Sequence, residues 1–334
     1  MAKCNLLELE VEEVIGSLKG VVEVWYGSNN VGKTYNFSKT EKPLLIACEA
    51  GARGVRCPTV HINSWGDFMD VVKQLTDTKT LPQMKEKYET IGIDTLEMMV
   101  LFSDNSVAQR YGVSTLSEIT GRENGYVISR TQIAMAIQKL VSASYHIIFL
   151  SHEEAVTMTD EMSGEEYEFL IPKQSKNEKS SARFVRDLAD VVVYLKANPY
   201  DVENDKEVLS TAIYKRTKTC FARSRFSDLP FCLPNFNAKE HQKILLDAIE
   251  ARAKREECGV TDYDEAKPQT ADEWKNDIKP LLTKVAKFNS EVAQGIIESQ
   301  LGVGVKVSKA TDEDCIKLEN IYNQLLTYIV QFNL

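Results

Sequence analysis

The sequence lacks several features that would place it in a specialised class of protein. No part of its 334 residues approaches the ~18 consecutive apolar residues that a transmembrane helix needs. The acidic start MAKCNLLELEVEEVIG has no basic-then-apolar leader, so no signal peptide is expected. The seven cysteines are scattered without a CxxC pair, and the four histidines show no metal-ligand spacing. These absences predict reduced thiols, a cytoplasmic location, no structural zinc site and no membrane partner.

An excess of positive charge is also absent. The 40 Lys and Arg residues face 49 Asp and Glu residues, so the net charge is -9. A surface that is basic all over is therefore excluded, and any polyanion must bind to a local patch. Hydrophobic residues at 43% and charged residues at 27% are ordinary globular values. At roughly 150 residues per domain, the length predicts about two domains.

Apolar runs that alternate with helical patterns predict the fold class. The runs typical of buried strands are 21–26, 44–48, 58–62, 88–93 and 146–150. Continuous apolar strands separated by helices predict an α/β fold, with a mostly parallel central sheet flanked by helices. Alternating polar and apolar residues at 166–171, 191–195 and 208–214 predict additional antiparallel strands. The polar segment 76–87 is predicted to be a connection.

A glycine-containing motif follows the first predicted strand. It reads Gly27, Ser28, Asn29, Asn30, Val31, Gly32, Lys33 and Thr34, which fits G-x-x-x-x-G-K-[ST]. In this pattern backbone N–H groups wrap a β-phosphate, the lysine reaches the β- and γ-phosphates, and the hydroxyl binds Mg²⁺. The central Asn-Asn pair is unusual, although asparagine tolerates left-handed backbone better than most residues. The motif predicts a site for a nucleoside triphosphate and Mg²⁺; the alternative is a chance match on a surface turn.

Two acidic residues follow other predicted strands. Asp94 comes directly after the run 88–93, and ligands of parallel sheets bind beyond the carboxyl ends of the strands. Asp94 can therefore share a crevice with the motif and hold Mg²⁺ together with Thr34. Glu49 follows the run 44–48 and could activate the water that attacks the γ-phosphate. The alternatives are an Asp94 that caps the next helix and a Glu49 that is a solvated acid.

Together these residues resemble a RecA-like P-loop ATPase core. The segments that carry the resemblance are GSNNVGKT, PLLIACEAG, ETIGIDTLEMM, HIIFLSHEE, LADVVVYL and KRTKTCFARSRF, which span residues 20–235. They are most similar to phage-encoded, single-domain RecA-like ATPases of the AAA or nucleotide-binding type, some of which act in single-strand annealing or recombination. GSNNVGKT and ETIGIDTLEMM occur in many P-loop proteins, whereas CEAG and a strand ending in Ser-His are more specific to the RecA-like branch.

The resemblance implies roles for individual residues. Glu49 would be the catalytic glutamate and would act beside Lys33 on bound ATP. Ser151 and His152 would occupy the position that senses the γ-phosphate. The alternative for His152 is a strand-end histidine bonded to neighbouring backbone. The choice of ATP over GTP rests on the resemblance alone.

The resemblance also implies an assembly. Arg216 and Lys218 match a basic pair that reaches the nucleotide of the next subunit in this branch, with Arg223 and Arg225 as further candidates. A cation supplied in trans would stabilise transition-state charge and couple hydrolysis to assembly. The implied partner is a second copy of the chain, in a ring or filament with nucleotide at the subunit interfaces. A solvated hairpin face is the alternative for Arg216 and Lys218.

RecA-like relatives bind single-stranded DNA through two loops. The corresponding segments here are 112–125 and the stretch after His152, which includes the basic segment 173–186. A basic loop beside an acidic body could follow a phosphate backbone, although charged loops are often only solvated. The candidate nucleic-acid residues are Lys173, Lys176, Lys179 and Arg183.

The composition changes after residue 250, where acidic residues gather. We predict a RecA-like core at 1–250, an acidic linker at 251–271 and a small helical module at 272–334. The module could simply pack its helices together, or it could dock a replication or recombination partner. The predicted function is Mg²⁺-dependent ATP hydrolysis linked to single-stranded DNA in phage recombination, annealing or replication. The alternatives are an ATP-dependent loader or remodeller of a protein, and a nucleotide-gated assembly module with little hydrolysis.

Overall fold

The computed structural model describes residues 14–49, 54–119, 124–199, 210–256, 260–261, 271–311 and 314–332. These residues divide into two compact units. The larger unit lies within residues 12–265, and the helices after residue 266 belong to the smaller one. None of the described helices is both long and apolar enough to span a membrane.

The larger unit is built on a sheet whose central strands run parallel. The parallel strands are β2 (Val22–Gly27), β3 (Pro43–Ala47), β4 (Thr59–His61), β5 (Thr90–Asp94), β6 (His146–Thr159) and β8 (Val191–Ala197). Antiparallel strands extend it as β7 (Glu166–Pro172), β9 (Ser210–Ile213), β10 (Arg223–Ser224) and β11 (Cys232–Leu233). The order is β11-β9-β8-β2-β6-β5-β3-β4, with β7 paired to the far half of β6 and β10 paired to β8. Strand β2 therefore lies between two parallel neighbours, β6 and β8.

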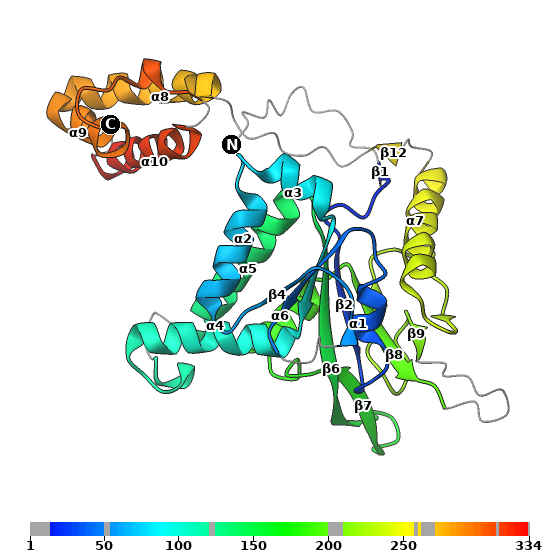
Figure 1. Ribbon diagram of the computed structural model, residues 1–334. Helices are drawn as coiled ribbons and strands as arrows, with labels where there is room; N and C mark the ends of the chain where they lie inside the picture. Colours follow the sequence, from blue (N-terminus) through cyan, green and yellow to red (C-terminus); the bar gives the residue numbers. More distant parts are fainter. Residues whose placement is uncertain are drawn as a thin grey trace. The chain divides into compact units, whose positions relative to one another are not determined.

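Helices cover both faces of this sheet (Figure 1). One face carries α2 (Trp65–Thr76), α4 (Leu96–Tyr111), α5 (Gly125–Ser142) and α6 (Ser181–Leu188). The other face carries α1 (Lys33–Phe37) and α7 (Ala238–Arg255). The unit also contains α3 (Leu81–Lys87), the 3₁₀ turn η2 (Leu116–Glu118) and the short parallel pair β1 (Val14–Ile15) and β12 (Val260–Thr261). The predicted α/β class, with a mostly parallel sheet flanked by helices, is confirmed.

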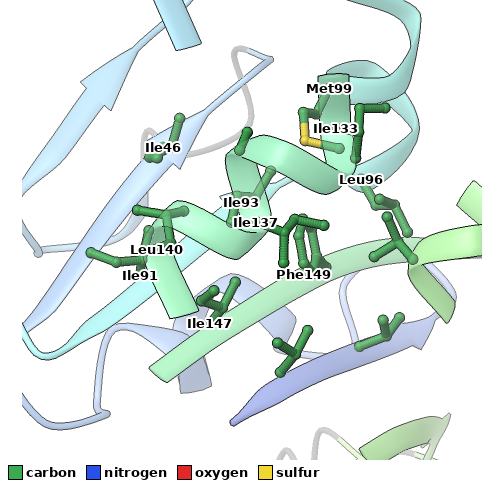
Figure 2. Packing of buried hydrophobic residues seen from close by; sticks show 14 of the residues in the cluster. Ile46, Ile91, Ile93, Leu96, Met99, Ile133, Ile137, Leu140, Ile147 and Phe149 are labelled. Atoms are coloured by element: carbon green, nitrogen blue, oxygen red, sulfur yellow. The ribbon is translucent and has the colours of Figure 1, made fainter. Parts of the chain in front are cut away.

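Successive side chains of each strand point to opposite faces of the sheet, so neighbouring residues belong to different cores. Figure 2 shows Ile147 and Phe149 of β6 packed against Ile137 of α5. The intervening Ile148 belongs to the core on the opposite face, as does Trp25 of β2. A strand that is buried on both sides must be apolar at every position, which explains the continuous runs in the sequence.

Some local predictions were incomplete. Strand β8 pairs antiparallel with β9 and β10, as predicted for its segment, but it also pairs parallel with β2. Its first five residues, from Val191, are all buried, so the run has the continuous apolar character of a central strand rather than an alternation. Helix α3 occupies part of the predicted connection 76–87; none of its residues is buried, so it leaves no apolar periodicity in the sequence.

The smaller unit consists of helices around a core of its own. They are α8 (Ala271–Phe288), α9 (Ser290–Leu301), the 3₁₀ turn η3 (Val307–Lys309) and α10 (Cys315–Phe332). Trp274 of α8 and Ile321 of α10 are buried in the same cluster as Ala293 of α9. The helical stretch 272–301 is interrupted at Asn289, whose side chain accepts hydrogen bonds from the first turn of α9. Of the expected linker, residues up to 255 continue α7, and 257–259 and 262–270 lie outside the described residues.

Candidate nucleotide-binding site

The predicted phosphate loop joins the end of β2 to the start of α1. Gly32 precedes the helix with φ 81°, and Asn30 has φ 63°, so both adopt the left-handed conformation. Gly27 lies so close to β8 that a Cβ atom there would be 2.3 Å from the carbonyl oxygen of Leu195. The tolerance of asparagine for this conformation thus explains how a loop with Asn at its centre keeps its shape.

Lys33 is buried and lies over the loop. Its Nζ atom donates hydrogen bonds to the carbonyl oxygens of Gly27 (2.9 Å) and Ser28 (2.7 Å). Burial lowers the pKa of Lys33, and the nearby carboxylates of Asp94 and Glu97 oppose this shift. The ammonium group is thus held where phosphate oxygens can replace the two carbonyl oxygens as its partners.

Asp94 and Thr34 meet at the carboxyl end of the sheet. The hydroxyl of Thr34 donates a 2.8 Å hydrogen bond to Oδ2 of Asp94, the last residue of β5. Burial raises the pKa of Asp94, while the hydrogen bond from Thr34 acts against the shift. The hydroxyl of Thr95, the next residue, is buried and has no hydrogen-bond partner among the described residues. A carboxylate, a threonine hydroxyl and an unpaired hydroxyl form a set of oxygen donors that fits Mg²⁺ and its bound waters.

One cavity brings most of the predicted site residues together. It has a volume of about 960 Å³ and is lined by Asn29, Asn30, Gly32, Lys33, Thr34, Tyr35, Glu49, Asp94, Thr95 and His152. This volume is within the range of ~300–1,000 Å³ that is usual for small-molecule sites. Glu49 is exposed on the cavity wall, where a water molecule can reach its carboxylate. The predicted neighbours of Glu49 in the CEAG segment, Ala50 and Gly51, lie outside the described residues.

Sequence reasoning missed Glu97, which holds His152 in place. Oε1 of Glu97 is 2.5 Å from Nδ1 of His152 and 3.3 Å from its backbone N, and Oε2 accepts from the Ser151 hydroxyl at 3.1 Å. Glu97 is 4% exposed, so few other groups compete for its oxygens. An acid three residues after Asp94 was a visible signal, but acids in the first turn of a helix are common for dipole reasons alone.

The predicted trans-acting cations lie outside the cavity of their own chain. Arg216 and Lys218 are exposed, and the Arg216 guanidinium is 4.9 Å from the centre of the Phe169 ring. Arg223 and Arg225 lie where β8 begins and bond within the chain, to the Asp187 carbonyl oxygen and to the Asp190 carboxylate (3.0 Å). Arg223 and Arg225 are at the opposite end of β8 from the phosphate loop of their own chain, and a role in trans stays a prediction for all four residues.

The predicted nucleic-acid residues lie on a turn and a helix. Lys173, Lys176 and Lys179 are exposed in the segment before α6. Arg183 lies within α6 and contacts Glu178 (3.4 Å) and Asp187 (3.5 Å). The second part of the expected basic loop is therefore helical. In the other expected loop, 112–125, the turn η2 is present and residues 120–123 lie outside the described residues.

Several known proteins are similar to this chain to different degrees. A solved structure, the RadB recombinase, is similar over 58% of this chain and 80% of its own, with 12% identity and a TM-score of 0.34. The SPbeta prophage-derived uncharacterized protein YorG of Bacillus subtilis is 30% identical over 316 residues, which cover 92% of this chain and 93% of that protein. The model of the AAA domain family matches residues 19–226, a segment that contains the phosphate loop, Glu49, Asp94 and His152. The chain therefore belongs to the AAA domain family of P-loop proteins.

Proposed function

We propose that this protein is a Mg²⁺-dependent ATPase that acts on single-stranded DNA. The observation that carries the proposal is the shared cavity of Lys33, Thr34, Asp94 and Glu49, with Thr34 and Asp94 joined by a hydrogen bond. A cationic lysine, oxygen ligands for a metal and a nearby carboxylate base are the groups that phosphoryl transfer to water requires.

Each residue has a defined part in this chemistry. The backbone N–H groups of the loop and Lys33 Nζ bind the β- and γ-phosphates and offset the charge that develops on them. Thr34 and Asp94 would hold Mg²⁺, which neutralises phosphate charge when it is bound. Glu49 accepts a proton from the attacking water and orients its oxygen toward the γ-phosphorus. His152, oriented by Glu97, presents its ring to the γ-phosphate.

Tyr35 offers a surface for the nucleobase. It follows Thr34 directly, lines the same cavity and is 52% exposed. A large aromatic ring that stays half exposed beside a nucleotide site is suited to stack on a base. Stacking tolerates any base, so this contact alone would not select ATP over GTP.

The proposed assembly and DNA site rest on exposed basic residues. Arg216 and Lys218 are exposed and outside their own cavity, as a cation that acts on a neighbouring subunit must be. Lys173, Lys176 and Lys179 provide exposed positive charge after the hairpin of β6 and β7, although the chain as a whole is acidic. Such a local patch suits the backbone of a single strand.

A second candidate function is an ATP-dependent loader or remodeller of a protein partner. The separate helical unit favours it, because Phe288, Val303 and Ile316 are large apolar residues with exposures of 57%, 88% and 62%. Exposed apolar side chains on a small module are available for a replication or recombination protein. In a third version, ATP sets only the assembly state and is barely hydrolysed.

The deciding experiment measures ATP turnover of the full chain, with and without single-stranded DNA, at two salt concentrations. Salt-sensitive stimulation by DNA is expected, since phosphate contacts weaken as salt rises. The Lys33→Ala variant should show no turnover above background in any condition. Turnover that is unchanged by DNA would contradict the DNA role and favour a protein partner, and turnover retained by Lys33→Ala would refute the site itself.

A further inference from the structure

The far half of β6 extends beyond the central sheet as one strand of a hairpin. Pairing of β6 with β5 ends at Leu150 and pairing with β2 ends at His152, but the strand continues to Thr159 and pairs antiparallel with β7. Figure 1 shows β6 and β7 reaching past the ends of the neighbouring strands. The proposed ATPase chemistry uses His152 at the base of this hairpin and assigns no role to the part that projects.

Hydrogen bonds at the two ends of the hairpin show which backbone groups of β6 face β7. At the base, the Lys173 N–H donates to the carbonyl oxygen of His152 (2.8 Å). At the tip, the Asp160 N–H donates to the carbonyl oxygen of Glu165 (2.8 Å). Bonded and non-bonded pairs alternate along an antiparallel ladder, so the even-numbered residues between these ends face β7. The groups that point away from β7 are the N–H and C=O groups of Ala155, Thr157 and Thr159.

This outer edge of β6 is an unpaired strand edge. No described residue is hydrogen-bonded to the three backbone positions that point away from β7. All three residues are exposed, and Met158 between them is 37% exposed. The edge 155–159 (AVTMT) contains neither a charged residue nor a proline. Because natural edge strands are usually protected by lysine, proline or a bulge, an edge without these features is a template for another strand.

The outer edge of β7, in the same hairpin, is protected in two ways. The Leu170 N–H donates to the carbonyl oxygen of Thr219 (2.8 Å), and the Leu170 carbonyl oxygen accepts from the Phe221 N–H (2.9 Å). Closer to the tip, the same edge carries the exposed charged side chains of Glu166 and Glu168. Of the two edges of the hairpin, the one on β6 is therefore open to a partner.

The charge of the hairpin tip indicates what kind of strand would fit this edge. The segment 160–168 (DEMSGEEYE) contains five acidic residues and no lysine or arginine. Hydrogen bonds from the backbone N–H groups of Ser163 and Met162 lower the pKa of Asp160, and the charge of Lys218 adds to this shift. Lys218 therefore offsets one of the acidic charges, and the tip remains negative. A strand that carries positive charge next to the tip would be attracted to it.

Two other occupants fit less well. A single strand of DNA is a polyanion and would be repelled by the acidic tip. A second copy of the chain, paired antiparallel through the same edge and centred on Thr157, would set Asp160 of one copy opposite Glu154 of the other. Like charges that lie directly opposite each other destabilise a sheet. The charge pattern thus favours a different protein as the partner.

We propose that the edge 155–159 of β6 binds an extended segment of a partner protein, which joins the hairpin as a further strand. Backbone groups of this segment bond to the N–H and C=O groups of Ala155, Thr157 and Thr159. Uncharged β-branched residues at its centre suit the neutral edge and cover Met158, and lysine or arginine residues at one end lie over the acidic tip. The site does not depend on bound nucleotide.

The test measures amide hydrogen exchange of the segment 153–161 by mass spectrometry, in the full chain without nucleotide. The probe is the synthetic peptide acetyl-TVTVTKK-amide, and acetyl-TVTVTEE-amide is the control with the same centre and the opposite charge. We expect the basic peptide to protect the amide hydrogens of Ala155, Thr157 and Thr159 in a saturable manner. The acidic peptide should bind roughly tenfold more weakly.

Three results of this experiment would overturn the proposal. Equal affinities of the two peptides, or no saturable protection by either, would contradict a site for a basic extended segment. Protection of the same amide hydrogens in the free chain would mean that a second copy already occupies the edge. Protection by a single-stranded oligonucleotide would identify the hairpin as a nucleic-acid site instead.

Two variants test whether the peptide binds at this edge. Thr157→Pro removes an outward N–H, and Thr157→Lys keeps the N–H but adds positive charge to the edge. Each should weaken binding of the basic peptide by roughly tenfold, whereas Thr131→Lys, the same substitution at an exposed position of α5, should not change it. Continued protection of the amide hydrogens of Phe169 and Ile171, which face β6, will show that the hairpin is kept. Unchanged binding in both Thr157 variants would overturn the proposal.

Discussion

Buried charges are balanced differently at the two ends of strand β2, in the nucleotide site at its carboxyl end and in the Glu23 network at its amino end. At the carboxyl end, burial shifts the pKa of Lys33 downward and that of Asp94 upward. Neighbouring charges and hydrogen bonds therefore do not fully replace the solvation that each group loses on burial. At the amino end, the Glu23 carboxylate accepts hydrogen bonds from Trp25, His146 and His241, and its pKa is lowered despite complete burial. Poorly balanced charges are typical of a site that binds a charged ligand, whereas the Glu23 carboxylate at the amino end is balanced by groups of the protein itself.

The largest expected effect is the loss of ATP turnover in Glu49→Gln, which tests the nucleotide site at the carboxyl end of the sheet. The variant keeps the size of the side chain but cannot accept a proton from water, so turnover should fall roughly a thousandfold. ATP should still bind, because the loop and Lys33 are unchanged; binding of a fluorescent ATP analogue and steady-state turnover measure the two effects. Glu41→Gln, an exposed acid before β3, is the control. Full activity of Glu49→Gln would exclude Glu49 as the base.

The variant Glu23→Gln tests how much the buried carboxylate at the amino end of β2 contributes to stability. Removing the charge between His146 and His241 leaves buried groups poorly paired, so the free energy of unfolding should fall by about 3 kcal/mol in urea denaturation at neutral pH. Because folding lowers the pKa of Glu23, its contribution is present above the unfolded-state pKa of about 4.3 and is lost as the pH falls further. The difference between wild type and variant should therefore shrink in acid.

The control for Glu23→Gln is Glu89→Gln. Glu89 forms an exposed ion pair with Lys42, and such pairs contribute little to stability. If Glu23→Gln proved as stable as Glu89→Gln, the amino-end network would not depend on a buried charge, and the contrast between the two ends would fail.

The smallest expected effect is a lower kcat in Glu97→Gln, which tests whether Glu97 orients His152 at the nucleotide site. Glu97→Gln weakens the hydrogen bond to Nδ1 of His152, so the ring loses its fixed orientation and kcat should fall about tenfold. KM for ATP should stay the same, because Glu97 does not line the cavity. Glu240→Gln, in the first turn of α7, is the matched control for a first-turn acid. A change in KM without a change in kcat would mean that Glu97 shapes the loop rather than orienting His152.

The sequence predicted those parts of the site that depend on residues close together along the chain. The phosphate loop and Asp94 come from local patterns, and the structure brings them together as predicted. The contacts of Glu97 with His152 and of Glu23 with His241 join residues 55 and 218 positions apart, so no local pattern contains them. The parallel pairing of β8 was missed for the same reason, since strand direction is set by tertiary contacts rather than by the strand's own residues.

The central place of β2 has a consequence for synthesis on the ribosome. Its neighbours β6 and β8 begin at His146 and Val191, and the hydrogen bond of the Val22 backbone N–H to Asp190 spans 168 positions. The strand that leads into the phosphate loop is thus synthesised before either of its two neighbours in the sheet. Pairing over such separations slows folding, because the chain must be made as far as Ile147 before Val22 can pair with β6, and as far as Asp190 before it meets the start of β8.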